Sequence, residues 1–209
     1  MSEAKGAIPH FYLTAEVDLT EALALRERLN GALEGGHISV NDLMIKATAL
    51  ALERVPALNA TYADSGVRRF AAVHIGFAAA IEEGLLTPVV RDCHLKSIGR
   101  IARETRALIE KARARTLAAE DLQGGTFTIS NLGMTEVVEF SAIINPPQVG
   151  ILAIARPTER PVADRGRVAF RWLLRATLSA DHRAVDGVTG AEFLKAFKGV
   201  LEHPERLML

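Results

Sequence analysis

Apolar and polar residues alternate along much of the chain, and a period of two predicts β-strands half-buried on a sheet. The alternating segments are residues 11–17, 124–133 and 167–179. Residues 149–155 are apolar throughout, which is typical of a strand buried on both faces. Residues 67–92 read as two further strands joined at Glu83 and Gly84. In the last alternating segment, the large apolar residues on one side are Val168, Phe170, Trp172 and Leu174.

Other segments repeat their apolar residues with the period of an amphipathic helix. Helices are predicted over residues 19–36, 39–56, 97–117 and 189–204. The apolar positions of the first helix are Leu19, Ala22, Leu23, Leu29 and Leu33. Gly35 and Gly36 are expected to end that helix. Ser39 or Asn41 should cap the second helix, and Pro56 should close it. Strands and helices mix without strict alternation, so we predict an α/β fold in the loose sense, a mixed sheet flanked by helices.

Length and composition predict one domain covering residues 1–209. The chain has 209 residues, of which 49% are hydrophobic and 24% charged, enough for a sizeable core. The chain has 25 basic residues (Lys and Arg) and 25 acidic residues (Asp and Glu), so its formal net charge is zero. A neutral chain argues against nucleic-acid or membrane binding and permits self-association. No apolar stretch reaches the length of a membrane span, and the N-terminus lacks a signal-peptide layout. The single cysteine, Cys93, rules out an internal disulfide, so we expect a reducing cytoplasm.

Most common chemical motifs are missing from the sequence. The six histidines do not fall at zinc-ligand spacing, and one cysteine cannot build a thiolate site, so no metal site is predicted. Phosphate loops, dinucleotide-binding glycine motifs and nucleophile elbows do not occur. Cys93 and His94 are adjacent, and adjacent side chains rarely point at each other, so we interpret Cys93 as unreactive. We interpret the basic stretch 110–121 as a solvated helix face.

One loop concentrates groups that can hold and use an imidazole. Residues 181–187 read Asp-His-Arg-Ala-Val-Asp-Gly. Taken alone, His182 is explained by a structural hydrogen bond, but its acidic neighbours favour a general base, because neutral imidazole accepts a proton near pH 7. Ser130 and Asn131 end another strand, where turn chemistry or a hydroxyl offered to a substrate explains them. A histidine base and a hydroxyl donor without a triad favour direct acyl transfer between two substrates, with Ser130 stabilising the oxyanion.

Six segments in order along the chain resemble a known family. They are PHFYLTAEVD, ISVNDLMIKATALAL, GLLTPVVRD, GGTFTISNLGM, INPPQVGILAIA and LSADHRAVDGVTGAEFL. They resemble the catalytic domain of the dihydrolipoamide acyltransferases, the core component of 2-oxo acid dehydrogenase complexes. The likeness covers essentially all 209 residues. Chloramphenicol acetyltransferase belongs to the same superfamily. The resemblance implies a chloramphenicol acetyltransferase-like trimer with active sites between subunits, where coenzyme A and a dihydrolipoyl group enter one channel from opposite ends.

The resemblance also implies roles for particular residues. His182 matches the family's catalytic base, Asp186 the acid that supports the site, and Ser130 the serine that faces the tetrahedral intermediate. The residues that match coenzyme A contacts are Arg26, Ser39, Ser130 and Asn131. Coenzyme A is then a substrate, and the lipoyl group is carried by a lipoyl domain that the sequence does not contain. The expected location is the cytoplasm, or the mitochondrial matrix in a eukaryote.

Departures from the family pattern bear on assembly. The sequence has no lipoyl or subunit-binding domain, through which family members bind the dehydrogenase and lipoamide dehydrogenase components. Residues 135–136 are Thr-Glu where relatives often have Phe-Gly. We predict that Leu207, Met208 and Leu209 have no partner inside the domain and are buried against a neighbouring trimer, giving a 24-subunit core.

Two other functions are compatible with the sequence. One is a trimeric or cage-forming scaffold with idle sites, and the other is an acetyltransferase acting on a free small molecule. The acyl group stays open among acetyl, succinyl and branched-chain groups, because the residues that line its pocket are not readable from one sequence.

Overall fold

A mixed β-sheet organises the chain. The computed structural model describes residues 2–33, 36–81 and 84–208. The sheet's strands are β1 (His10–Asp18), β4 (Ile75–Phe77), β7 (Val89–Val90), β8 (Phe127–Asn131), β9 (Gly150–Ile154), β10 (Thr158–Asp164) and β11 (Arg167–Asp181). The main path is β1-β11-β9-β8-β4-β7, and β10 pairs with the first half of β11. Because β8 is parallel to β4 and β9 while the other pairs are antiparallel, the predicted mixed sheet is confirmed.

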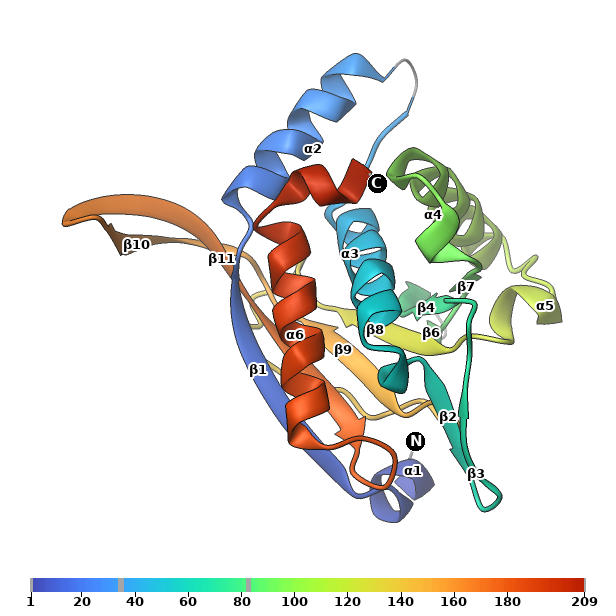
Figure 1. Ribbon diagram of the computed structural model, residues 1–209. Coiled ribbons are helices and arrows are strands. Elements are labelled where there is room, and N and C mark those ends of the chain that lie inside the picture. The colour runs from blue at the N-terminus through green and yellow to red at the C-terminus, as the bar shows by residue number, and fades with distance from the viewer. Residues whose placement is uncertain (1, 34–35, 82–83, 209) are drawn as a thin grey trace.

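The long helices cover one face of this sheet (Figure 1). The helices are α1 (Ser2–Ala7), α2 (Thr20–Ala32), α3 (Val40–Arg54), α4 (Ile98–Arg113), α5 (Ala119–Leu122) and α6 (Gly187–Leu201), with 3-10 turns η1 (Pro56–Leu58), η2 (Cys93–Leu95) and η3 (Pro204–Met208). Of the short helices, α1 lies beyond the start of β1 and α5 lies at the edge near β7. α3 packs between α6 and α4, and most of its residues are buried for that reason. No helix in the described ranges is long and apolar enough to span a bilayer.

The centre of the sheet is buried on both faces, which the apolar sequence predicts for β9 and the alternating sequence does not predict for β11. All five residues of β9 are buried, and so are the last six residues of β11. On the helix side, Phe127 of β8 packs against Phe193 of α6 with ring centroids 5.5 Å apart. Burying one such side chain contributes roughly 1.5–3 kcal/mol. This layer therefore fixes the ends of β8 and β11, where the predicted site residues lie.

The strand prediction for residues 67–92 is wrong in detail. The region contains five short strands, namely β3 (Gly66–Arg69), β4, β5 (Ala79–Ile81), β6 (Gly84–Leu86) and β7. β3 pairs with β2 (Ala60–Ala63) outside the main sheet, and β5 pairs with β6. The predicted join agrees with the pairing of Ile81 with Gly84, but each predicted strand is divided, and Pro88, which offers no N–H to a ladder, lies between β6 and β7. Glu83, at the predicted join, lies outside the described residues.

The predicted helix ends are partly confirmed. α2 stops at Ala32, and Leu33, expected on the apolar side, is 40% exposed. Gly35 lies outside the described residues. Ser39, rather than Asn41, caps α3, because its side chain accepts a hydrogen bond from the backbone N–H of Asp42. α3 ends just before Pro56, which begins η1.

A hairpin of β10 and β11 projects beyond the body of the sheet (Figure 1). The sequence pattern does not predict β10, whose seven residues are mostly polar and include Pro161. The apolar side of β11 continues onto the hairpin: Leu174 is buried, but Val168, Phe170 and Trp172 are 72%, 64% and 41% exposed. Large apolar residues on one side of an exposed ribbon are typical of a surface that binds a partner.

The C-terminal tail packs inside the chain, contrary to the sequence prediction. η3 folds back against α2, α3 and α6, and Leu207 is fully buried in the core. The prediction that Leu207 lacks an internal partner is therefore wrong. Met208 is 57% exposed, and Leu209 lies outside the described residues.

Candidate active site

The histidine loop follows the C-terminal end of β11 and is held by Asp181. The buried carboxylate of Asp181 accepts hydrogen bonds from Arg183 Nε at 2.9 Å and Nη2 at 2.7 Å, and from the Arg183 backbone N–H at 3.0 Å. The Arg183 guanidinium also lies 4.0 Å from the centroid of the Tyr62 ring, a cation–π contact. These contacts fix the neighbours of His182 and leave His182 itself exposed.

His182 is oriented by contacts with β1 and with Pro9, the residue before β1. Its backbone N–H donates to the carbonyl of Pro9 at 3.1 Å. Its imidazole packs on Phe11, with ring centroids 4.9 Å apart and planes tilted by 57°. A ring that is packed on one side and exposed elsewhere has the placement that a general base needs.

Asp186 has a structural task that the sequence does not predict. It is the N-cap of α6, and its Oδ1 accepts a hydrogen bond from the Thr189 backbone N–H at 2.8 Å. Hydrogen bonds from Thr189, chiefly that of its backbone N–H, lower the pKa of Asp186, and the charge of His182 lowers it further. Asp186 therefore carries a negative charge near His182 at neutral pH.

Ser130 and Asn131 lie at the C-terminal end of β8. Asn131 Nδ2 donates to Asn41 Oδ1 at 3.0 Å, and Asn131 Oδ1 accepts from the Gly133 N–H at 2.7 Å. These bonds tie the end of β8 to the start of α3. Ser130 is half-buried beside them.

His182 and Ser130 do not meet within one chain. Ser130 pairs with Ala153 of β9, and Ala153 pairs with Thr177 of β11. His182 lies five residues beyond Thr177, which at about 3.3 Å per residue is roughly 17 Å along the strand. The two predicted catalytic groups therefore sit at opposite ends of the sheet.

The residues predicted to contact coenzyme A gather at the start of α3. Arg26 Nε donates to the carbonyl of Ile38 at 2.8 Å, next to Ser39. Asn131 is joined to the same helix end through Asn41. Ser39 Oγ is already engaged by Asp42, to which it donates at 2.7 Å. Arg26, Ser39, Ser130 and Asn131 thus share one region, away from His182.

A pocket of about 370 Å³ opens beside Ser39, between the start of α3 and α4. Its cationic lining residues are Arg106 and Arg113, and His37 also lines it. Arg106 Nη2 donates to the carbonyl of His37 at 3.0 Å. Sequence reasoning does not single out these arginines, although their spacing of two helical turns places both on one side of α4. Asp42 and Glu110 also line the pocket and offset the charge of its two arginines, so the N-terminus of α3 is the feature that suits a phosphate group.

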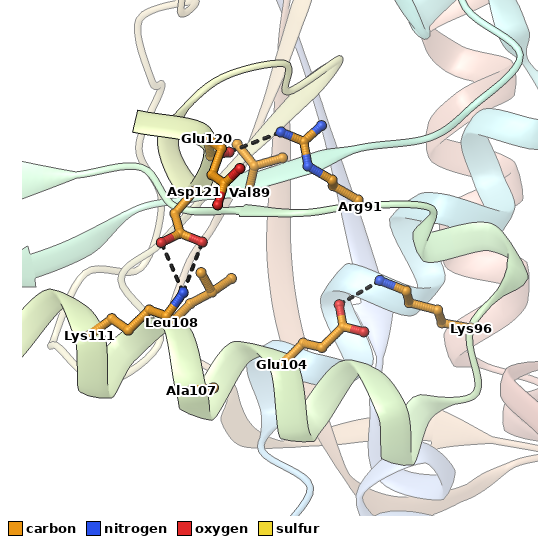
Figure 2. Close-up of a pocket in the computed structure, with 9 residues that line it drawn as sticks. All are labelled: Val89, Arg91, Lys96, Glu104, Ala107, Leu108, Lys111, Glu120 and Asp121. Carbon is orange, nitrogen blue, oxygen red and sulfur yellow. Dashed lines mark hydrogen bonds and ion pairs between the residues drawn. The ribbon is translucent and has the colours of Figure 1, made fainter. Parts of the chain in front are cut away.

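A second pocket, of about 480 Å³, lies between β7, α4 and α5 (Figure 2). Its charged side chains pair with one another: Lys111 with Asp121 and Lys96 with Glu104. Arg91 donates to the backbone carbonyl of Glu120. Lys111 and Asp121 belong to the stretch interpreted above as a solvated helix face, so that interpretation holds only in part. Its acidic and basic side chains balance, so this pocket, like the one beside Ser39, carries no excess positive charge, and it lies beside no residue predicted to contact coenzyme A.

Cys93 is inert, as the sequence predicts. It is fully buried, and its Sγ donates to the carbonyl of Val90 at 3.1 Å. Burial raises the pKa of the Cys93 thiol to about 12. Among the described residues, no group of three or more His, Cys, Asp or Glu side chains is arranged to hold a metal ion.

The chain shares its fold with chloramphenicol acetyltransferase. The chain superposes on chloramphenicol acetyltransferase with a TM-score of 0.61 at 17% identity, covering 93% of this chain and 89% of the other. Residues 1–209 match the family described as 2-oxoacid dehydrogenases acyltransferase (catalytic domain). The chain belongs to that family.

Individual relatives of the chain are named as acetyltransferase components of pyruvate dehydrogenase complexes. The chain is 45% identical to the dihydrolipoyllysine-residue acetyltransferase component 3 of the mitochondrial pyruvate dehydrogenase complex of Arabidopsis thaliana, covering 99% of this chain and 39% of the relative. It superposes with a TM-score of 0.95, at 35% identity, on the cubic core of the pyruvate dehydrogenase multienzyme complex, covering 100% of this chain and 87% of that one.

The chain also superposes on Azotobacter vinelandii dihydrolipoamide acetyltransferase with a TM-score of 0.95 at 35% identity, covering 100% of this chain and 87% of that one. That structure was determined to define the role of a serine, a histidine and an asparagine in catalysis. The chain spans half or less of the length of the first two curated relatives that it matches.

Proposed function

We propose that the chain moves an acetyl group between coenzyme A and a dihydrolipoyl group, in a site that two copies of the chain build together. One observation carries the proposal. In the Azotobacter vinelandii enzyme the catalytic serine precedes the histidine by 52 residues, and the asparagine follows it by four. Ser130, His182 and Asp186 have the same spacings. Asp186 stands where that relative has asparagine, so this chain adds a negative charge beside its histidine.

In the proposed reaction His182 removes the proton from the thiol of coenzyme A or of dihydrolipoamide. A free thiol has a pKa of roughly 8.5, so an imidazole base forms the thiolate at modest cost. The thiolate attacks the carbonyl of the other partner's thioester, forming a new C–S bond and an oxyanion. Ser130 donates a hydrogen bond to that oxyanion. Collapse of the intermediate breaks the old C–S bond, and His182 returns the proton to the leaving sulfur. The acyl group never becomes attached to the protein.

The separation of His182 and Ser130 supports a shared site. The reacting thiol and carbonyl must lie about 3 Å apart, whereas these two residues of one chain are separated by roughly 17 Å along β11 alone. A repeated head-to-tail contact around a threefold axis brings one chain's His182 to the next chain's Ser130 and closes as a trimer.

We test the proposed activity with purified protein, acetyl-CoA and dihydrolipoamide, following the formation of S-acetyl-dihydrolipoamide. Succinyl-CoA and branched-chain acyl-CoA are the comparison donors, and we expect acetyl to be preferred because the curated relatives are acetyltransferases. A chain that binds coenzyme A but transfers nothing acts as a scaffold. Transfer to a small hydroxyl or amine, with none to dihydrolipoamide, favours an antibiotic-modifying activity.

The projecting hairpin is our candidate for the trimer contact. Phe170 and Trp172 lie exposed on one side of it, and burying them against a second copy stabilises the assembly. We predict that the double variant Phe170→Asp, Trp172→Asp dissociates into monomers and loses acyl transfer. Light scattering and the transfer assay measure both effects. The matched control is Val67→Asp, another exposed apolar residue on a strand, which should stay trimeric. A trimeric double variant rules out this contact.

Met208 is the candidate for contact between trimers. It is exposed at the end of η3, while its neighbour Leu207 belongs to the core, so truncating the tail is not a clean test. We propose a 24-subunit cube, by analogy with the cubic core of the relative. Met208→Asp should then give single trimers that keep their activity, and a wild-type chain that is only a trimer contradicts the cube.

Lipoyl domains are the proposed partners of the catalytic site. The dehydrogenase and lipoamide dehydrogenase components are proposed to be recruited through domains that relatives carry outside this segment. The proposed location is the cytoplasm or the mitochondrial matrix.

Coenzyme A is proposed to place its phosphates in the pocket beside Ser39. We predict that Arg106→Gln with Arg113→Gln weakens coenzyme A binding about tenfold or more, because charged hydrogen bonds contribute about 1.5–3 kcal/mol. Calorimetry should show little change for pantetheine, which lacks the nucleotide. The control Arg100→Gln, also on α4 but paired with Glu104, should bind coenzyme A normally. Equal losses for both ligands contradict the phosphate assignment.

A further inference from the structure

The imidazole of His10 joins two backbone segments beside the histidine loop. The Ile144 N–H donates to His10 Nε2 at 3.1 Å, and His10 Nδ1 lies 2.8 Å from the carbonyl oxygen of Ile8. Because Nε2 accepts a hydrogen bond, it carries no proton, and Nδ1–H must be the donor to Ile8. Both bonds therefore exist together in only one neutral tautomer of His10.

One of these bonds fixes the backbone that holds His182. His10 is the first residue of β1 and pairs with Asp181, the last residue of β11. The residue between Ile8 and His10 is Pro9, whose carbonyl accepts the His182 N–H. The bond to Ile8 thus restrains the backbone on which the position of His182 depends.

The other bond anchors residues 132–148, which connect β8 to β9. This segment follows the serine end of β8 and leads to the start of β9, which pairs with Ala180 at the histidine end of the sheet. Along the way Thr14 Oγ1 donates to Glu139 at 3.2 Å, and Ser179 Oγ donates to the carbonyl of Ala142 at 2.7 Å. The Ile144–His10 bond is the next tie, beside the histidine loop.

We propose that His10 is a positioning residue for acyl transfer: it holds the histidine loop and the 132–148 segment in register and does not touch substrate. This role rests on the proposed function. It implies an effect on turnover and little on coenzyme A binding, since the His10 side chain bonds Ile8 and Ile144 and none of the residues assigned to coenzyme A.

Two substitutions separate positioning from simple packing. His10→Phe keeps a ring to stack on Tyr12, whose centroid is 6.1 Å away, but removes both hydrogen bonds. We expect turnover to fall about 10- to 100-fold, the cost of misplacing a catalytic group by about 1 Å. The KM for coenzyme A should change by less than about twofold. His10→Gln supplies one donor and one acceptor and should recover most of the turnover. The control His203→Gln, at an exposed histidine beyond α6, should match wild type.

Hydrogen exchange tests the same contacts without relying on activity. In His10→Phe the amides of Ile144 and His182 should exchange at least about tenfold faster than in wild type, and His10→Gln should slow them again. If these two amides exchange at the wild-type rate in His10→Phe, the His10 hydrogen bonds do not restrain the backbone, whether or not the protein transfers acyl groups. Faster exchange with wild-type turnover overturns the positioning role. If the wild-type protein transfers no acyl group, the proposed function and the positioning role are both wrong. The exchange rates then still show whether His10 restrains the two backbone segments.

Discussion

Acyl transfer should all but disappear when His182 is replaced by alanine. General-base catalysis typically contributes about 10²–10⁴-fold, and in the proposed reaction His182 moves the proton in both directions. The substitution should leave the fold intact, because the side chain is exposed and its backbone bond to Pro9 is kept. Turnover of acetyl-CoA with dihydrolipoamide, measured beside the thermal unfolding midpoint, checks both statements.

His203→Ala is the matched control for this prediction. His203 is also exposed, but it lies at the far end of α6 from the histidine loop. It should retain full turnover. Wild-type turnover in the His182→Ala variant would show that another group moves the proton.

The second large effect is expected at Ser130. Removing one oxyanion donor typically costs about 10²–10³-fold in turnover, or roughly 3–4 kcal/mol. Because such a donor acts in the transition state, Ser130→Ala should change the coenzyme A dissociation constant by less than about twofold. Single-turnover kinetics and calorimetry measure the two quantities separately.

Ser65→Ala serves as the comparison, since Ser65 is exposed at the tip between β2 and β3. Normal turnover in Ser130→Ala with a raised dissociation constant would make Ser130 a ground-state contact to coenzyme A and leave the oxyanion without its proposed donor.

Local patterns predict those parts of the fold that local chemistry decides. The apolar run of β9 and the capped start of α3 follow from burial and from the Ser39 side chain, and both are found as predicted. β10 is missed because an exposed ribbon needs no apolar alternation of its own. The burial of Leu207 is missed because it depends on where η3 folds back, which is a tertiary contact.

The site also divides into parts that the local sequence predicts and parts that depend on tertiary contacts. The residues of the histidine loop stand out in sequence because Asp181, His182 and Asp186 are close together in the chain. The pairing of Arg183 with Tyr62 and the pocket beside Ser39 depend on contacts between distant segments, which one sequence does not reveal. Asp186 belongs to the histidine motif and also caps α6, and the second role becomes visible only where the structure places the start of that helix.

The central claim is that each active site uses His182 from one chain and Ser130 from the next. The most direct test mixes two inactive variants, His182→Ala and Ser130→Ala, by co-refolding or co-expression with different affinity tags. Each variant alone should be nearly inactive. Under random mixing, about three-quarters of closed trimers contain both chains, and each of these has one complete site of three. The account predicts recovery to about a quarter of wild-type activity in the mixture. Mixed trimers that co-purify through both tags and yet stay as inactive as the separate variants would contradict it.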